Sequence, residues 1–241
     1  MIKITNLIKT FGKNEVLKGI DLEISEGGVF AILGPNGSGK TTIIKTILGM
    51  VLPTSGSIEV NGEPVKNNYQ YRKDIEYLPQ IARFPENLKV SELIDMVQDI
   101  RGQKGNPNQL IDLFDLKLFL STKLSNLSGG TRQKVNIVLC FMFDNDIIIL
   151  DEPTVGLDPV ALIRLKDWIK REKELGKTIL ITTHIMDVVE ELSDEIVFLL
   201  EGKIYFRGTT SEMYNITGET RLERSIARIL EANYEKNKQT A

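Results

Sequence analysis

The clearest chemistry in this sequence lies in one glycine-rich stretch, residues 34–42. Its members are Gly34, Pro35, Asn36, Gly37, Ser38, Gly39, Lys40, Thr41 and Thr42. Glycines at these positions allow several backbone N–H groups to point at one dense anion, and a helix beginning near Lys40 adds its positive dipole end. We expect Lys40 to contact the β and γ phosphates of a nucleoside triphosphate, Thr41 to ligate Mg²⁺ and Thr42 to contact the α phosphate. The alternative is a glycine-rich turn with an incidental lysine.

Two adjacent carboxylates, Asp151 and Glu152, follow the hydrophobic run of residues 147–150. At the carboxyl end of a strand, Asp151 would face the same crevice as the phosphate loop and complete the magnesium site through a water. Glu152 would point differently and orient or deprotonate an attacking water. Paired acids at a strand end also occur as loop or helix-initiating residues, so the functional interpretation depends on the phosphate loop upstream.

Two single polar residues are expected at the same sheet edge. Gln80 follows the short predicted strand at 75–78, and its amide can bond both Mg²⁺ and the water. His184, the only histidine of the chain, follows the buried run 178–182, where a neutral imidazole could contact the γ phosphate and fix the water geometry of Glu152. Taken alone, Gln80 is more simply explained as a surface loop residue, and His184 as a packed or solvated residue.

A second anion-binding pattern is predicted at residues 127–133, where Ser128, Gly129 and Gly130 begin a helix. This segment lies beyond a helical insert and is expected to be too far from the phosphate loop of its own chain. Two chains arranged head to tail would bring Ser128 and Gly130 onto the γ phosphate of the partner. The structural alternative is an ordinary helix N-cap.

The elements that must position these residues form an alternating strand and helix pattern, which predicts a parallel sheet with its ligand at the carboxyl ends of the strands. Its buried strands are predicted at 29–33, 75–78, 147–150 and 178–182. A smaller antiparallel layer is predicted from alternation at 2–4 and 22–24 and from a hairpin at 58–65. A separate, last hairpin is predicted at 195–206. Helices are predicted at 43–48, within an insert at 90–127, at 131–143, from the N-cap Asp158 to Gly176, and at 220–236 with frayed final residues.

Composition narrows the class of protein. The chain has 241 residues, 41% hydrophobic and 26% charged, with a net charge of -3. The acidic balance argues against a nucleic-acid partner. The single Cys140 excludes a disulfide within the chain and suits a reducing compartment. The sequence begins without a signal-peptide pattern, and its longest apolar run, 135–143, is too short to cross a bilayer. We therefore expect any membrane function to come from another polypeptide.

Together these motifs resemble the nucleotide-binding subunit of an ATP-binding cassette (ABC) transporter. The resemblance covers about residues 1–217, with a helical subdomain at about 86–143 and a C-terminal helical tail at 218–241. It implies an α/β fold: a P-loop NTPase parallel-sheet core with an antiparallel β subdomain and an inserted α-helical subdomain. It also implies ATP and Mg²⁺ as cofactors, an ATP-sandwich homodimer, Phe11 stacked on adenine and a coupling loop at Asp158. Phe11 stands where tyrosine is more usual, and Thr131 where glutamine or methionine is frequent.

The implied function is ATP hydrolysis that powers a membrane transporter. Residues 131–135 and the compact length look most like exporter-type ATPases, and among these like the subunit of the copper-processing transporter for nitrous oxide reductase maturation. A separate permease would dock a helix at the cytoplasmic face of the cell membrane, in a groove between Gln80 and the helical insert that includes Arg83, Phe84 and Pro85. One alternative is a soluble ABC ATPase in translation or DNA repair. Such proteins are expected to have two cassettes in one chain or a long coiled-coil insertion, and this sequence shows neither. Another is a kinase or GTPase switch, which leaves residues 127–131 and His184 unexplained.

Overall fold

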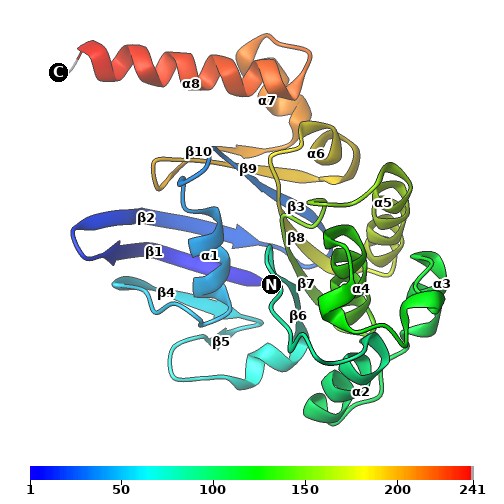
Figure 1. Cartoon of the computed structure of the whole chain (residues 1–241). Helices are drawn as coiled ribbons and strands as arrows, with labels where there is room; N and C mark the ends of the chain where they lie inside the picture. Colours follow the sequence, from blue (N-terminus) through cyan, green and yellow to red (C-terminus); the bar gives the residue numbers. More distant parts are fainter. Residues whose placement is uncertain (240–241) are drawn as a thin grey trace.

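The computed structural model describes the backbone of residues 1–239 and the side chains of residues 1–233. Its larger sheet has six strands in the order β10-β9-β3-β8-β7-β6 (Figure 1). All neighbours run parallel except β9 and β10. The strands are β3 (Gly28–Leu33), β6 (Ile75–Leu78), β7 (Ile147–Asp151), β8 (Thr178–Thr182), β9 (Glu195–Leu200) and β10 (Lys203–Gly208).

The central strands are buried on both faces, which explains their continuous apolar sequences. Every residue of β7 and β8 is buried, as are residues 29–33 of β3. The predicted parallel core is therefore confirmed, and the carboxyl ends of β3, β6, β7 and β8 meet at one edge. That edge is where the chemistry-bearing residues follow their strands.

A second sheet is antiparallel, with the order β2-β1-β4-β5. Its strands are β1 (Ile2–Phe11), β2 (Asn14–Ile24), β4 (Ser55–Val60) and β5 (Glu63–Pro64). In the predicted hairpin at 58–65, Asn61 and Gly62 form the turn between β4 and β5, and both have positive φ, 51° and 80°, as a tight hairpin turn requires. The buried face of this sheet and helix α1 (Lys40–Ile47) form one apolar cluster with the large sheet, so α1 is packed between the two sheets.

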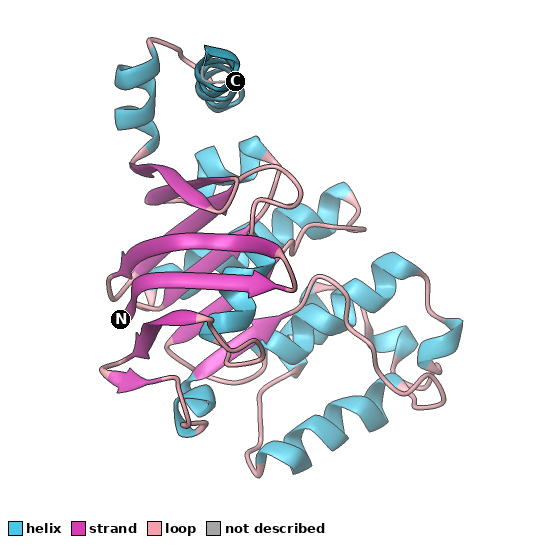
Figure 2. Ribbon diagram, turned by 90° about the vertical axis from the view of Figure 1, so that its left-hand side faces the viewer, coloured by secondary structure: helices cyan, strands magenta, loops and turns pink. Residues whose placement is uncertain are grey.

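Most of the remaining helices lie on the opposite side of the large sheet (Figures 1 and 2). They are α2 (Val90–Arg101), α3 (Asn108–Leu113), α4 (Gly129–Phe141), α5 (Pro159–Glu174) and α6 (Met186–Leu192), with 3₁₀ turns at Gln70–Asp74, Lys117–Phe119 and Leu124–Asn126. Helix α4 begins two residues before the predicted start at 131, because the Ser128 side chain caps it. Helix α5 starts at the predicted Asp158-Pro159 pair and ends before Gly176.

Two C-terminal helices, α7 (Thr210–Thr217) and α8 (Leu222–Gln239), complete the described chain. The sequence pattern predicted α8 but not the short α7. Leu222 and Ile226 of α8 and Met213 of α7 are buried against strands β3 and β9, so the segment treated as a tail begins on the sheet. Figure 1 shows α8 continuing past the sheet. Of the final residues predicted to be frayed, 237–239 belong to α8, and residues 240 and 241 lie outside the described residues. Within the described part, none of the helices has the length and apolar character needed to cross a membrane.

Candidate functional site

The glycines of the phosphate loop are required by packing and by backbone geometry. Gly34 leaves β3 with φ 154°, and a Cβ there would lie 2.1 Å from the Leu199 carbonyl oxygen. Gly39 has φ 110°, and its Cβ would lie 2.7 Å from Leu17 Cδ2. Gly37, with φ 81°, has open space where a Cβ would be. The two outer glycines let the loop close onto neighbouring strands, and the middle one leaves its backbone accessible.

Lys40 begins α1 and folds back over this loop. Its Nζ donates hydrogen bonds to the Gly34 carbonyl at 2.7 Å and the Pro35 carbonyl at 3.2 Å. Burial lowers the pKa of Lys40, and the charges of Glu152 and Asp151 oppose that shift. Beside it, the buried Ser38 hydroxyl has no hydrogen-bond partner within the part of the chain that the structure describes. The loop therefore contains one buried hydroxyl group, that of Ser38, which the described chain leaves without a hydrogen-bond partner.

The two carboxylates diverge at the end of β7. Asp151 is 1% exposed and accepts a hydrogen bond from the Thr182 hydroxyl at 2.5 Å. Glu152 has φ 52°, which is uncommon outside glycine, and its Oε2 lies 2.9 Å from His184 Nδ1. The two carboxylates therefore have different side-chain partners, Thr182 for Asp151 and His184 for Glu152. His184 contacts Glu152 while its own side chain stays 63% exposed.

The phosphate loop and Glu152 line one cavity of about 480 Å³, a size usual for small-molecule sites. Of the predicted residues, those that line it are Asn36, Gly37, Gly39, Lys40, Thr41, Thr42, Gln80 and Glu152. Asn14 and Val16 also line it and were missed by sequence reasoning. The signal for both was weak, since they sit in the first residues of β2 and carry no motif. Four other predicted residues of these segments, together with His184, are absent from the lining: Gly34, Pro35, Ser38 and Asp151.

Other predicted residues do not line this cavity. Phe11, at the end of β1, is 48% exposed, and Lys9 Nζ lies 4.6 Å from its ring centre. Its stacking on adenine stays a prediction. Ser128, Gly129 and Gly130, at the start of α4, and Asp158, at the start of α5, are also absent from the lining. A single chain therefore brings together the phosphate loop, Gln80 and Glu152, but not the second glycine pattern.

The second glycine pattern is attached to the loop that follows Glu152. Ser128 caps α4 by accepting the Thr131 N–H at 3.1 Å, and a Cβ on Gly130 would lie 2.7 Å from the Gly156 carbonyl oxygen. Lys134 Nζ lies 2.7 Å from Asp158 Oδ2, and this contact lowers the pKa of Asp158. Gln133 donates to the Pro153 carbonyl at 3.0 Å. The start of α4 and residues 153–158 are therefore connected by several contacts.

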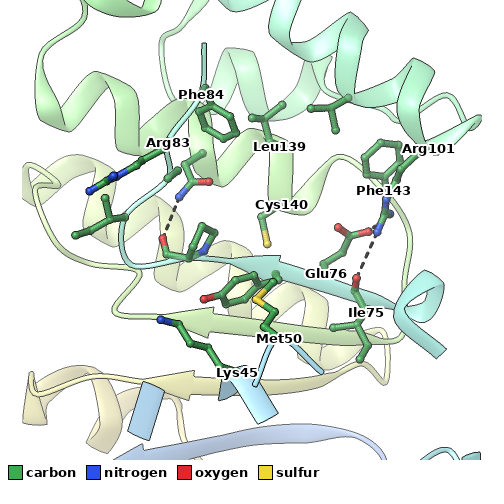
Figure 3. Close-up of a pocket in the computed structure, with 16 residues that line it drawn as sticks. Lys45, Met50, Ile75, Glu76, Arg83, Phe84, Arg101, Leu139, Cys140 and Phe143 are labelled. Carbon is green, nitrogen blue, oxygen red and sulfur yellow. Dashed lines mark hydrogen bonds and ion pairs between the residues drawn. The ribbon is translucent and has the colours of Figure 1, made fainter. Parts of the chain in front are cut away.

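A separate groove of about 570 Å³ lies between the large sheet and the helical layer (Figure 3). Its walls are mainly apolar and include Phe84, Leu139, Cys140 and Phe143. At one end, Arg101 pairs with the buried Glu76 and lies over the Phe143 ring, 4.5 Å from its centre. Burial raises the pKa of Glu76 to about 7, against the opposing effect of Arg101. Cys140 is also buried, and its pKa is raised by that burial.

Comparison with known proteins identifies the family. The family model described as "ABC transporter" matches residues 17–155. An uncharacterized ABC transporter ATP-binding protein of Methanocaldococcus jannaschii is 36% identical over 217 residues, covering 88% of this chain and 79% of that protein. The lantibiotic transport ATP-binding protein SrtF of Streptococcus pyogenes is 35% identical, covering 85% of this chain and 89% of the relative. The linearmycin resistance ATP-binding protein LnrL of Bacillus subtilis is 31% identical, covering 96% of this chain and 77% of that protein.

Solved structures agree with these relatives. The ATP-binding subunit of an ABC transporter superposes with a TM-score of 0.90 at 28% identity, covering 95% of this chain and 99% of that one. A dimeric ATP-binding cassette in a post-hydrolysis state with ADP and Pi has a TM-score of 0.78 at 25% identity, covering 87% of this chain and 98% of that one. These likenesses confirm the predicted fold class. The chain belongs to the ABC transporter family, as an ATP-binding subunit with ATPase activity.

Proposed function

We propose that two copies of this chain enclose two Mg-ATP molecules and drive a membrane exporter. The observation that carries the proposal is the separation described above: Lys40, Gln80 and Glu152 share one cavity, while Ser128 to Gly130 start a helix outside it. A second copy, turned head to tail, would supply Ser128 and Gly130 to the γ phosphate. Cassettes of similar fold that are described as dimeric support this arrangement.

The residues at the strand ends suit Mg²⁺, which prefers hard oxygen ligands and retains waters. The Thr41 hydroxyl and the Gln80 amide oxygen would hold it directly, and Asp151 would hold it through a water. The set contains one carboxylate, in keeping with the absence of any group of three or more His, Cys, Asp or Glu that could hold a metal among the described residues. When bound, the ion would neutralise charge on the phosphates.

The remaining groups would act on the water and the γ phosphate. Glu152 would accept a proton from the attacking water, and His184, in contact with Glu152 Oε2, would keep that carboxylate oriented. Lys40 would exchange its contacts with the Gly34 and Pro35 carbonyls for the β and γ phosphates. Hydrolysis would then remove the phosphate that both chains contact, and the pair of chains would separate.

Changing Glu152 to Gln tests this proposal, because it keeps the shape of the side chain and removes the base. The variant should bind ATP as the unchanged chain does, lose nearly all turnover, and elute as a dimer in ATP and Mg²⁺ during size-exclusion chromatography. Glu59→Gln, at an exposed position on β4, is the matched control and should hydrolyse ATP normally. Normal turnover of Glu152→Gln, or a monomer under these conditions, would contradict the proposal.

We further propose that the groove of Figure 3 receives a helix of a separate permease at the cytoplasmic face of the membrane. Met50 and Ile81, 61% and 72% exposed, offer apolar surface at the groove. Lys45 and Arg83 lie at the end away from the Glu76–Arg101 pair, and within the described side chains neither has an ion-pair partner (Figure 3). An apolar helix with an acidic residue toward Lys45 and Arg83 would complement both features.

Membrane sedimentation checks the docking surface, using the chain produced together with a candidate permease to which the unchanged chain binds. Phe84→Glu, within the groove, should leave the chain in the supernatant. Leu118→Glu, at a position 90% exposed and absent from the groove lining, should still sediment with the membranes. Equal sedimentation of both variants would show that the permease binds elsewhere.

The direction of transport is proposed from the relatives. One is named for Nod factor export, in Cupriavidus metallidurans, and another for resistance to linearmycin. The copper-processing assignment stays a prediction, since neither name mentions copper. A soluble ABC ATPase in translation or DNA repair is the alternative, and failure of the chain to bind any permease would favour it.

A further inference from the structure

The last residue of β8, Thr182, lies between the two carboxylates at the end of β7. Its side chain is completely buried. The Thr182 hydroxyl donates a hydrogen bond to Asp151 Oδ1 at 2.5 Å, and the Thr182 hydroxyl oxygen accepts one from the Glu152 N–H at 3.2 Å. The Glu152 N–H also donates to the Thr182 carbonyl at 2.9 Å. One threonine therefore contacts both residues that the proposed reaction assigns to Mg²⁺ and to water.

A hydroxyl group can donate one hydrogen bond and accept two, so the Thr182 hydroxyl can donate to Asp151 and accept from the Glu152 N–H at the same time. Donation to a carboxylate is charge-assisted, which makes the bond to Asp151 short and directional. With Oδ1 occupied in this way, the orientation of the Asp151 carboxyl group is fixed and its second oxygen remains for another partner. The contacts to the Glu152 N–H restrain the residue whose φ is 52°, a conformation that needs support from its surroundings.

Two other threonines of the same segment show that the role does not belong to β8 threonines in general. Thr178, at the opposite end of the strand, uses its hydroxyl to accept the Gly27 N–H at 2.9 Å. Thr183, the next residue after the strand, uses its hydroxyl to accept the Ile185 N–H at 3.1 Å. All three are buried, but of their three hydroxyls within the described residues only that of Thr182 is hydrogen-bonded to a carboxylate.

We propose that Thr182 is a positioning residue for ATP hydrolysis: its hydroxyl orients Asp151 toward the magnesium site and holds the Glu152 backbone in its left-handed conformation. The inference rests on the proposed role of Asp151 at Mg²⁺. It assigns to Thr182 no contact with nucleotide or metal. Its consequence is that the benefit of Mg²⁺ for nucleotide binding depends on a hydroxyl group at position 182.

The experiment compares the affinity for a fluorescent ATP analogue in Mg²⁺ and in EDTA, using the full chain. Thr182→Val keeps the shape of the side chain and removes the hydroxyl, while Thr182→Ser keeps the hydroxyl. Thr178→Val is the matched control, since it removes a buried hydroxyl with one backbone partner from the same strand. For Thr182→Val we expect the affinity in Mg²⁺ to fall by about tenfold or more, as loss of a hydrogen bond to a charged group predicts, with the affinity in EDTA unchanged.

The controls separate positioning from a purely structural effect. Thr182→Ser should restore most of the Mg²⁺ effect, and Thr178→Val should keep it even if its melting temperature falls. Turnover of Thr182→Val should fall further than its affinity, because Glu152 is displaced as well. A normal Mg²⁺ effect in Thr182→Val, or the same loss in Thr178→Val, would overturn the inference. If the unchanged chain showed no Mg²⁺ effect, the magnesium assignment itself would be wrong.

Discussion

Two helices of this chain begin with glycines and a serine, yet their N-termini are built differently. Helix α1 begins after Gly39, whose φ is 110°, and no side chain caps it. Helix α4 begins after Ser128, whose hydroxyl accepts the Thr131 N–H and also contacts the Thr131 hydroxyl at 2.8 Å. Both ends carry the positive side of a helix dipole. The N-terminus of α1 is therefore free of a side-chain cap, whereas the N-terminus of α4 is already capped by Ser128.

Burial and charge strengthen this contrast. At α1, Ser38 and Lys40 are 3% and 8% exposed, and Lys40 lies in the field of two carboxylates. At α4, Ser128 and Gly129 are exposed. The nearby cations are already engaged there, Arg132 with the Leu124 carbonyl and Lys134 with Asp158. We therefore expect the α1 site to supply nucleotide affinity, and the α4 site to act only when a second chain brings it to the phosphate.

The largest expected effect is loss of nucleotide affinity in Lys40→Ala. Removing a charged donor from a phosphate should weaken binding by about 2–3 kcal/mol, roughly a hundredfold in Kd. Isothermal titration calorimetry with ATP measures the change directly. Lys3→Ala, at an exposed position on β1, should bind as the unchanged chain does. Unaltered affinity in Lys40→Ala would remove the α1 site from its assigned role.

A second prediction concerns turnover and joins the two sites. Ser128→Arg should bind ATP normally as a single chain but hydrolyse little, because the bulky cation blocks contact with the partner. An equal mixture of Ser128→Arg and Lys40→Ala chains should regain roughly a quarter of the normal turnover, since half of the dimers are mixed and each contains one intact site. No recovery, once mixed dimers have been confirmed by mass spectrometry, would argue against sites shared between chains.

How far the sequence predicted this site depended on whether the signal was local. Gly34, Gly37 and Lys40 follow a buried strand at fixed spacing, so both the loop and its helix were predicted from the sequence. The positive φ of Glu152 was not, because glutamate carries no turn signal and the conformation is supported by contacts with Thr182. From the sequence, Thr182 was predicted only as the last residue of a buried strand.

Other differences have the same cause. Asn14 lines the cavity because β1 and β2 pair and bring the start of β2 toward α1. No local sequence pattern indicates this tertiary arrangement. Helix α7 was missed although Thr209 and Glu212 form a capping box, since its eight residues bury mainly Met213 and so give little periodicity. In this chain, sequence patterns predicted the elements well and the contacts between distant elements poorly.

The smallest expected effect tests whether Ser128 is more than a cap. Ser128→Ala should lower the free energy of unfolding by about 1 kcal/mol, as loss of an N-cap does. Thr209→Ala removes the corresponding cap of α7, where the Thr209 side chain accepts the Glu212 N–H, and should cost about the same in chemical denaturation. Only Ser128→Ala should reduce ATP turnover, because only that hydroxyl would meet the phosphate bound by a second chain. Equal turnover in the two variants would reduce Ser128 to a structural cap and leave the contrast between α1 and α4 without a functional meaning.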